Sequence, residues 1–190
     1  MRRGAARLFS LYACCPKRKE SRETMENRKQ RTLTKVLLVI YLAMLTWLVL
    51  FKLSFSLSMF YRYQHINLIP FGASFLPDGR LNLAEILGNV FIFIPLGIFL
   101  KMLKPSWSFA KKTALCFSLS LVYEVLQYVF ALGTTDVTDL LDNTVGGMLG
   151  IGLYILFKKW WKGKTDRVMN IFMLVFMALI LAAVLYLNME

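Results

Sequence analysis

Five apolar segments, each close to the length of a membrane-spanning helix, constrain the fold of this chain more than any other feature. A helix needs about 20 mostly apolar residues to cross about 30 Å of hydrocarbon. With 57% hydrophobic residues and a mean hydropathy of +0.55, the chain is more apolar than a soluble core of this size requires. The pattern predicts an all-α, multi-pass transmembrane helical bundle in a cell membrane, with spans at residues 36–51, 83–100, 113–132, 139–157 and 168–187.

The basic residues predict how this bundle is oriented. Along the chain, the segments outside the apolar runs hold eleven, three, four, none, five and none of the 23 Lys and Arg residues. Cytoplasmic loops carry an excess of Lys and Arg, so the alternation places the N-terminus in the cytoplasm and the C-terminus outside after five crossings. The same rule accounts for the net charge of +12. Because the basic residues do not form one continuous surface, we expect no binding to nucleic acid.

Three regions are expected along the chain. Residues 1–35 contain many basic and few large apolar residues, which predicts a disordered cytoplasmic tail. Residues 36–157 are expected to form a four-helix membrane domain, within which residues 61–82 are too irregular for a span and form an interfacial loop. Residues 158–190 then supply a basic linker and the fifth transmembrane helix.

Polar side chains lie in stripes on three of the predicted helices. At about 100° per residue, an arc of about 100° on the fourth helix holds Asp139, Asp142, Asn143, Gly146 and Gly150. A similar stripe on the second helix contains Asn82, Glu85 and Asn89, and one on the third contains Ser120, Glu124 and Gln127. Ionisable groups that face lipid are costly, so the three stripes are expected to converge, with those of the second and fourth helices in the external half of the membrane.

The chemistry of these residues allows two uses. Carboxylate oxygens suit a hard cation such as Mg²⁺ or Ca²⁺, and carboxylates in unequal surroundings suit general acid and base catalysis. No cofactor is otherwise expected, and the spacing identifies no metal. The alternative for the amides and glycines is packing between helices. The candidate catalytic residues are Glu124, Asp139 and Asp142, and the candidate binding residues are Asn82, Glu85, Asn89, Gln127, Asp136, Asn143 and Arg80.

Four motifs follow one another across residues 67–150. They are Asn67-Leu68-Ile69-Pro70-Phe71, Asn89-x-Phe91-Ile92-Phe93-Ile94-Pro95-Leu96-Gly97, Glu124-x-x-Gln127, and Asp136-x-x-Asp139-x-x-x-Asn143-Thr144-x-Gly146-Gly147. Their order and spacing resemble the VanZ-like membrane protein family. The family often has an Arg shortly before the first of these acids and an extra acid beside the second. Here those positions are occupied by threonine and glycine, so an anion site is either lost or supplied by Arg80.

The resemblance implies a bacterial membrane protein with a role like that of the family's founding member, which is associated with low-level teicoplanin resistance. It implies no agreed reaction. The first hypothesis is that an external, carboxylate-lined pocket binds or acts on a cell-envelope component, such as a lipid-linked cell-wall precursor or a glycopeptide. One alternative is an enzyme for a lipid-linked or peptidoglycan-related substrate, with Glu124 as proton donor and Asp139 or Asp142 as base or cation ligand. The other is a non-catalytic membrane scaffold.

Overall fold

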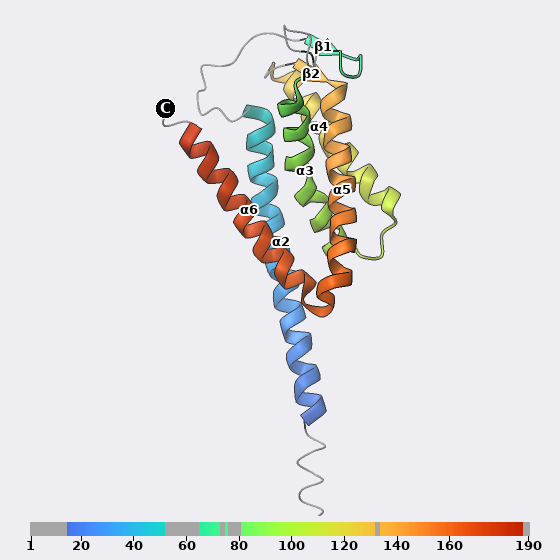
Figure 1. The fold of residues 1–190 in the computed structure, drawn as a ribbon, viewed down its shortest axis with the longest axis vertical. Helices are drawn as coiled ribbons and strands as arrows, with labels where there is room; N and C mark the ends of the chain where they lie inside the picture. The colour runs from blue at the N-terminus through green and yellow to red at the C-terminus, as the bar shows by residue number, and fades with distance from the viewer. Residues whose placement is uncertain (1–14, 52–64, 73–74, 76–80, 132–133, 188–190) are drawn as a thin grey trace, which may run out of the picture.

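The computed structural model describes residues 15–51, 65–72, 75, 81–131 and 134–187, and within them the chain is helical with one short strand pair (Figure 1). The described helices are α2 (Cys15–Phe51), α3 (Leu83–Leu103), α4 (Phe109–Val129), α5 (Val137–Trp161) and α6 (Thr165–Leu187). A short 3-10 helix, η2 (Lys162–Lys164), joins α5 to α6. The helical class predicted from the sequence is therefore confirmed.

Four of these helices are long and apolar enough to cross a membrane. Their candidate spans are Thr24–Leu50, Leu83–Leu103, Val137–Trp161 and Thr165–Tyr186. The third predicted span, residues 113–132, corresponds to α4, which is a helix of 21 residues but is not one of these four candidates. The chain is therefore a membrane protein with at least four apolar helices, and a fifth crossing stays a prediction.

The N-terminal helix begins earlier than the sequence predicts. The first span was expected to start at residue 36 after a disordered tail, whereas α2 already begins at Cys15. The residues that precede the apolar segment are rich in Lys, Arg and Glu, which are good helix formers. Helix can therefore continue out of the apolar segment, so the part of the tail from Cys15 onward is helical rather than disordered. Residues 1–14 lie outside the described part of the chain.

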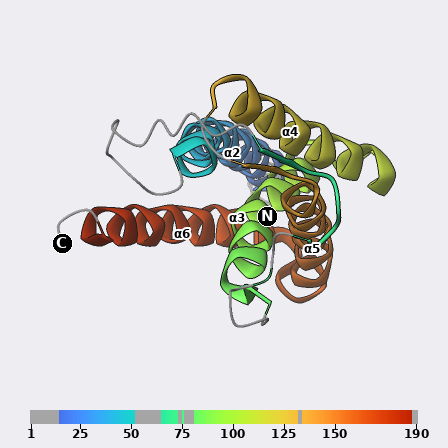
Figure 2. The same cartoon turned by 90° about the horizontal axis from the view of Figure 1, so that it is seen from above.

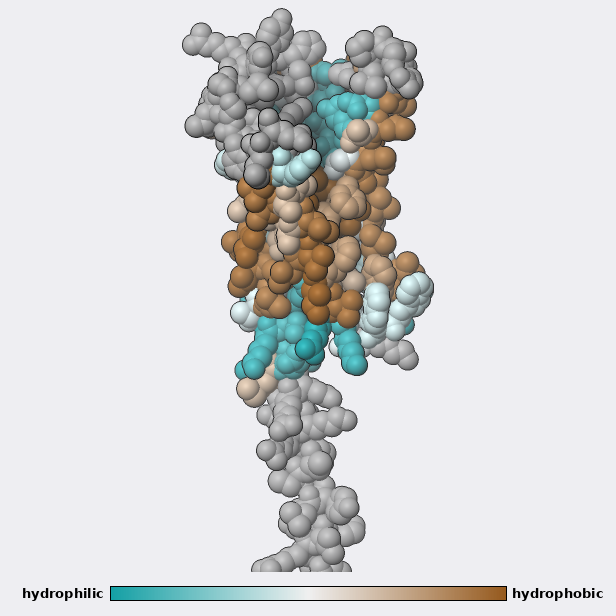
Figure 3. All heavy atoms as spheres, turned by 60° about the vertical axis from the view of Figure 1, so that its left-hand side comes forward, coloured by the Kyte–Doolittle hydropathy of each residue, from teal (hydrophilic) through white to brown (hydrophobic). Residues whose placement is uncertain are grey.

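The helix ends divide into a basic end and a polar end. Residues 101–112 and 158–167, which include nine Lys and Arg, lie at the ends of α3, α4, α5 and α6 that face the same way (Figure 1). The two short strands and the start of α5 lie at the opposite end. Between the two ends, a continuous band of apolar side chains covers the face shown in Figure 3. The fold thus brings together the basic segments that the charge pattern assigns to one side.

Helices α3 and α5 pack closely because glycines replace side chains where they cross. A Cβ built on Gly146 or Gly150 of α5 would overlap the carbonyl oxygen of Val90 or Ile94 of α3. In the opposite direction, a Cβ on Gly97 of α3 would overlap the backbone of α5. The glycine spacing in α5 therefore has the packing role predicted for it.

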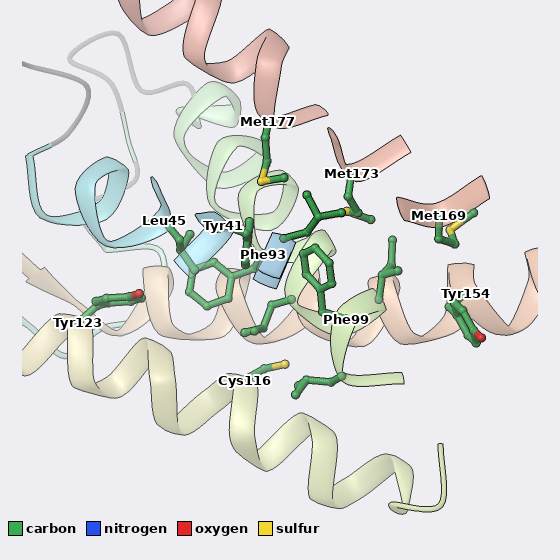
Figure 4. Close-up of a cluster of buried hydrophobic side chains, with 14 residues drawn as sticks. Tyr41, Leu45, Phe93, Phe99, Cys116, Tyr123, Tyr154, Met169, Met173 and Met177 are labelled. Carbon is green, nitrogen blue, oxygen red and sulfur yellow. The ribbon is translucent and has the colours of Figure 1, made fainter. Parts of the chain in front are cut away.

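A buried apolar cluster links these helices to α2 and α6. Phe93 and Phe99 of α3 are completely buried at its centre, and three methionines at four-residue spacing place one face of α6 against it (Figure 4). Tyr41 of α2 packs on Phe99 with 5.6 Å between ring centroids, and its hydroxyl donates to the Ile92 carbonyl at 2.6 Å. Viewed from above, α6 extends away from the other helices (Figure 2).

The interfacial loop contains a strand that the sequence did not predict. Strand β1 (His65–Asn67) pairs in parallel with β2 (Thr134–Asp136), and Asn67 lies opposite Asp136. Each strand has only three residues, so neither shows the alternation of apolar and polar positions that would indicate a strand. The pair ties the loop to the segment that precedes α5.

Candidate functional site

A cavity of about 250 Å³ lies at the polar end of the bundle, between α2, α3, α4 and α5. Its polar residues come from the first two turns of α3 and α5 and from the last two turns of α4. Its lining contains six of the ten candidate site residues: Glu85, Asn89, Glu124, Gln127, Asp139 and Asn143. Apolar and small residues complete the lining: Leu48, Val49, Ala84, Gly88 and Ile92. The three polar stripes therefore meet at one cavity, as predicted.

Asn89 and Asp139 connect α3 to α5 across the cavity. The Asn89 Nδ2 amide donates to Asp139 Oδ1 at 2.6 Å. Because a carboxylate oxygen can only accept, this contact fixes the orientation of the amide. The pair therefore holds the Asp139 side chain in a defined position in the cavity lining.

Two buried amides connect α4 to its neighbours. Gln127, which is 2% exposed, donates from Nε2 to the Val49 carbonyl of α2 at 3.0 Å. Asn143 of α5, also 2% exposed, donates from Nδ2 to Ser120 Oγ of α4 at 2.9 Å. Both amides therefore hydrogen-bond neighbouring helices together, which is the packing role that the sequence allowed for them. The remaining oxygens, Gln127 Oε1 and Asn143 Oδ1, are buried with no hydrogen-bond partner among the described residues.

Glu124 reaches from α4 to the segment that leads into α5. Its Oε2 accepts a hydrogen bond from the Asp136 backbone N–H at 3.0 Å, and both residues are buried. The Thr135 hydroxyl donates to the Glu124 backbone carbonyl at 3.2 Å. The single carboxylate of the third stripe therefore lines the cavity and also holds the start of the next helix.

Asp136 lies outside the cavity lining and organises the cavity's rim. It precedes α5, and its Oδ1 accepts the Thr138 N–H at 2.8 Å, which is the contact of a helix N-cap. Its Oδ2 accepts Asn67 Nδ2 at 3.1 Å, and Asn67 Oδ1 in turn accepts the Ile69 N–H at 3.2 Å. A single carboxylate thus satisfies donors from two segments that are far apart in the sequence.

Phe71 adopts an unusual backbone conformation beside this network. Its φ of 61° lies in the left-handed region, which is uncommon for a residue with a large side chain. Its N–H donates to Thr138 Oγ1 at 2.9 Å, a contact that helps to compensate for the strain. The loop motif from Asn67 to Phe71 is therefore anchored at both of its ends, to Asp136 and to the first turn of α5.

The other candidate residues have different surroundings. Asn82 caps α3, accepting from the Glu85 N–H at 3.4 Å and donating to Glu85 Oε2 at 3.0 Å. Asp142 is buried but is not part of the cavity lining, and its Oδ2 has no hydrogen-bond partner among the described residues. Arg80 lies outside the described residues.

The site chemistry is that of carboxylates and amides. In the described part of the chain, no group of three or more His, Cys, Asp or Glu side chains is placed to hold a metal ion. Two partners of the site were not identified from the sequence: the Asn67 side chain, whose bond to Asp136 spans 69 residues, and the Val49 backbone carbonyl. A backbone carbonyl is present in every residue, so the sequence cannot indicate which one acts as an acceptor. The role of Asn67 depends on the pairing of β1 with β2, and these strands are too short to be predicted.

Taken together, the apolar helices and the buried polar residues define a helical membrane protein with a polar cavity near one end of its bundle. The model of the VanZ/LLP1 family matches residues 38–158, which contain every described residue that lines this cavity. The chain belongs to the VanZ/LLP1 family.

One curated relative extends this result. The chain is 44% identical over 141 residues to Protein VanZ of Enterococcus faecium, a match that covers 73% of this chain and 84% of the relative. No solved structure matches the chain significantly. The resemblance inferred from the four motifs is therefore confirmed.

Proposed function

We propose that the protein contributes to teicoplanin resistance or to maintenance of the cell envelope, and that it does so by binding a cell-envelope component in the polar cavity. One observation carries this proposal: carboxylate and amide side chains from three helices line a single cavity of about 250 Å³. Ionisable groups inside a membrane protein are costly and are functional by default. The similarity to Protein VanZ supports the biological role.

The proposal places the cavity on the external side of the membrane. The basic segments lie at the opposite end of the bundle (Figure 1), and such segments remain in the cytoplasm. In this arrangement α4 is the third of five crossings, since it connects the basic end to the polar end.

We therefore expect the C-terminus to be external. Alkaline phosphatase fused after residue 190 should be active, and green fluorescent protein at the same position should be dark. A fusion after Lys162 serves as the control and should give the reverse result, because that segment is basic. Equal phosphatase activity from both fusions would contradict the orientation.

Removing Glu124 and Asp139, two of the three carboxylates that line the cavity, should abolish protection. We expect a teicoplanin-susceptible bacterial strain that expresses the double variant Glu124→Gln, Asp139→Asn to have the minimal inhibitory concentration of the empty-vector strain. Both substitutions preserve side-chain size. However, Glu124→Gln leaves one acceptor oxygen rather than two, and Asp139→Asn removes the charge that Asn89 binds.

The matched control is Glu26→Gln together with Asp166→Asn. It makes the same two chemical changes in the basic segments, outside the cavity, and the amide oxygens of the new side chains can still accept from Gln30 and from the Tyr154 hydroxyl. Membrane-protein levels of all strains are compared by immunoblotting. Full protection by the cavity variant at equal protein level would show that the cavity is not the functional site.

A second candidate function is an enzyme that acts on a lipid-linked or peptidoglycan-related substrate. It is favoured by one observation: Glu124 and Asp139 line the same cavity and accept from different hydrogen-bond donors. Carboxylates in different surroundings suit acid and base roles, with Mg²⁺ or Ca²⁺ as an additional electrostatic partner for the substrate. Product formation by purified protein, with and without these cations, distinguishes this function from binding alone. A non-catalytic scaffold would form no product, and substitutions in the cavity would change which proteins crosslink to it.

A further inference from the structure

A second cavity, which is almost entirely apolar, lies between α2 and α6. Its volume is about 280 Å³, and it is lined by Ala43, Met44, Trp47, Leu48, Ile180, Leu181 and Val184. We call it the α2/α6 groove. No charged or amide side chain lines it among the described residues. It lies in the apolar part of both candidate spans, so its lining suits a hydrocarbon chain and disfavours a polar group.

The groove and the polar cavity are adjacent through one side chain. Leu48 of α2 lines both of them and is partly exposed. On the cavity side, Gly88 of α3 leaves open space, because a Cβ built on it would meet nothing within 4 Å. Leu48 is therefore the point at which an alkyl chain in the groove comes nearest to the polar surroundings of the cavity.

Two amides that line the polar cavity each have one oxygen without a hydrogen-bond donor among the described residues. Gln127 Oε1 and Asn143 Oδ1 are buried and have no hydrogen-bond partner in the described part of the chain. The Gln127 Nε2 donates to the Val49 carbonyl, so Oε1 is the end of this amide that is left to accept. A buried acceptor without a donor is unfavourable. A head group with O–H or N–H donors would remove this cost after a small rotation of either amide.

We propose that the cavity and the α2/α6 groove form one binding site for an amphiphile. The alkyl chain lies in the groove between α2 and α6, and a head group that donates hydrogen bonds enters the cavity. This inference rests on the proposed function, because it takes the polar cavity as the functional site. It adds the chemical class of the ligand, a lipid-like molecule with a hydroxyl or amide head group, and it adds α6, which lies outside the family match, to the site.

The test uses Trp47 as a reporter of the groove. The chain has four tryptophans, and the triple variant Trp107→Phe, Trp160→Phe, Trp161→Phe leaves only Trp47. The protein is placed in nanodiscs of phosphatidylcholine, whose head group has no hydrogen-bond donor. A monoacylglycerol with a dibrominated acyl chain is then added, because bromine quenches tryptophan fluorescence on contact. We expect saturable quenching of Trp47.

Head-group selectivity is measured with matched probes on the same protein. The dibrominated monoacylglycerol should reach half-quenching at a concentration at least about tenfold lower than its dimethyl ether, since one lost hydrogen bond to a buried group is worth about that factor. A second pair of probes tests an amide head group. It consists of a dibrominated fatty primary amide, which has N–H donors, and its N,N-dimethyl amide, which has none. If both capped probes quench as well as their parents, the cavity does not select donors and the inference is wrong.

The groove is tested by filling it. Ala43→Phe, which adds a ring to the groove lining, should raise the half-quenching concentration at least about fivefold, whereas Ala182→Phe on an exposed part of α6 outside the lining should leave it unchanged. Quenching that rises linearly with probe and is equal in both variants would indicate bulk lipid contact and would overturn the inference. The head-group comparison needs no variant of the groove, so it remains decisive if Ala43→Phe misfolds.

The two proposals can fail separately. Loss of teicoplanin protection in the Glu124 and Asp139 variant, together with no head-group selectivity, would keep the proposed function and reject the amphiphile site. Retained protection, together with donor-selective quenching that depends on the groove, would reject the proposed role and keep the site.

Discussion

Gly146→Val should lower the free energy of unfolding of the helix bundle by about 3 kcal/mol, an effect at the upper end of overpacking in a tight interface. A Cβ at Gly146 would overlap the Val90 carbonyl and lie 3.0 Å from the Phe93 Cβ. Backbone atoms cannot rotate away as a side chain can, so α3 and α5 would have to separate. The shift is measured as the change in the midpoint of detergent-induced unfolding, followed by circular dichroism.

Gly152→Val is the matched control for this substitution. It lies on the same helix and makes the same chemical change, but a Cβ there meets nothing within 4 Å. Both variants carry the same change in intrinsic helix propensity, so the difference between them isolates the packing. Equal midpoints for the two variants would show that the α3/α5 contact does not determine stability.

The network around Asp136 predicts a rescue by exchange of side chains. Asp136→Asn should destabilise the protein by about 2 kcal/mol, because one amide oxygen cannot serve both Thr138 N–H and Asn67 Nδ2. Asn67→Asp alone should also destabilise it, since two carboxylates would then face each other. The combined Asn67→Asp, Asp136→Asn variant restores a donor and an acceptor at every contact, and it should unfold within about 0.5 kcal/mol of the parent.

A double-mutant cycle on the same unfolding assay checks this prediction. The parent, the two single variants and the exchange variant give a coupling free energy directly. Additive effects of the two substitutions would show that Asn67 and Asp136 do not interact. Asn67→Ala adds a further comparison, because it removes the donor without placing a second charge beside Asp136.

The helices could be predicted from the sequence because their signal is local. Apolar runs of the right length mark α3, α5 and α6 within a few residues. The polar arcs on α3, α4 and α5 contain the six polar residues that meet at the cavity. The basic N-terminal segment was harder to interpret. Its charge suggests disorder, but the same residues favour helix, and a helix already formed in the apolar segment extends into it at little cost.

Only part of the candidate site could be predicted from helical spacing. Helical spacing places Glu124 and Gln127 on one face of α4, and Asp139 and Asn143 on one face of α5. It cannot show that Asp142, on the same predicted face, lies outside the cavity lining, because that depends on the rotation of α5 against α3. Nor can it show that Asn89 and Asp139 form a pair.

The sequence by itself determined the membrane class, the helical segments, the polar stripes and the family of this protein, since each depends on neighbouring residues or on fixed spacings. Tertiary structure decided which polar groups are partners: Asn89 with Asp139, Asn67 with Asp136 and Glu124 with the Asp136 backbone. These contacts join residues that are 50, 69 and 12 positions apart. The first exists because glycines let α3 and α5 approach closely, and the second because strands β1 and β2 pair Asn67 with Asp136.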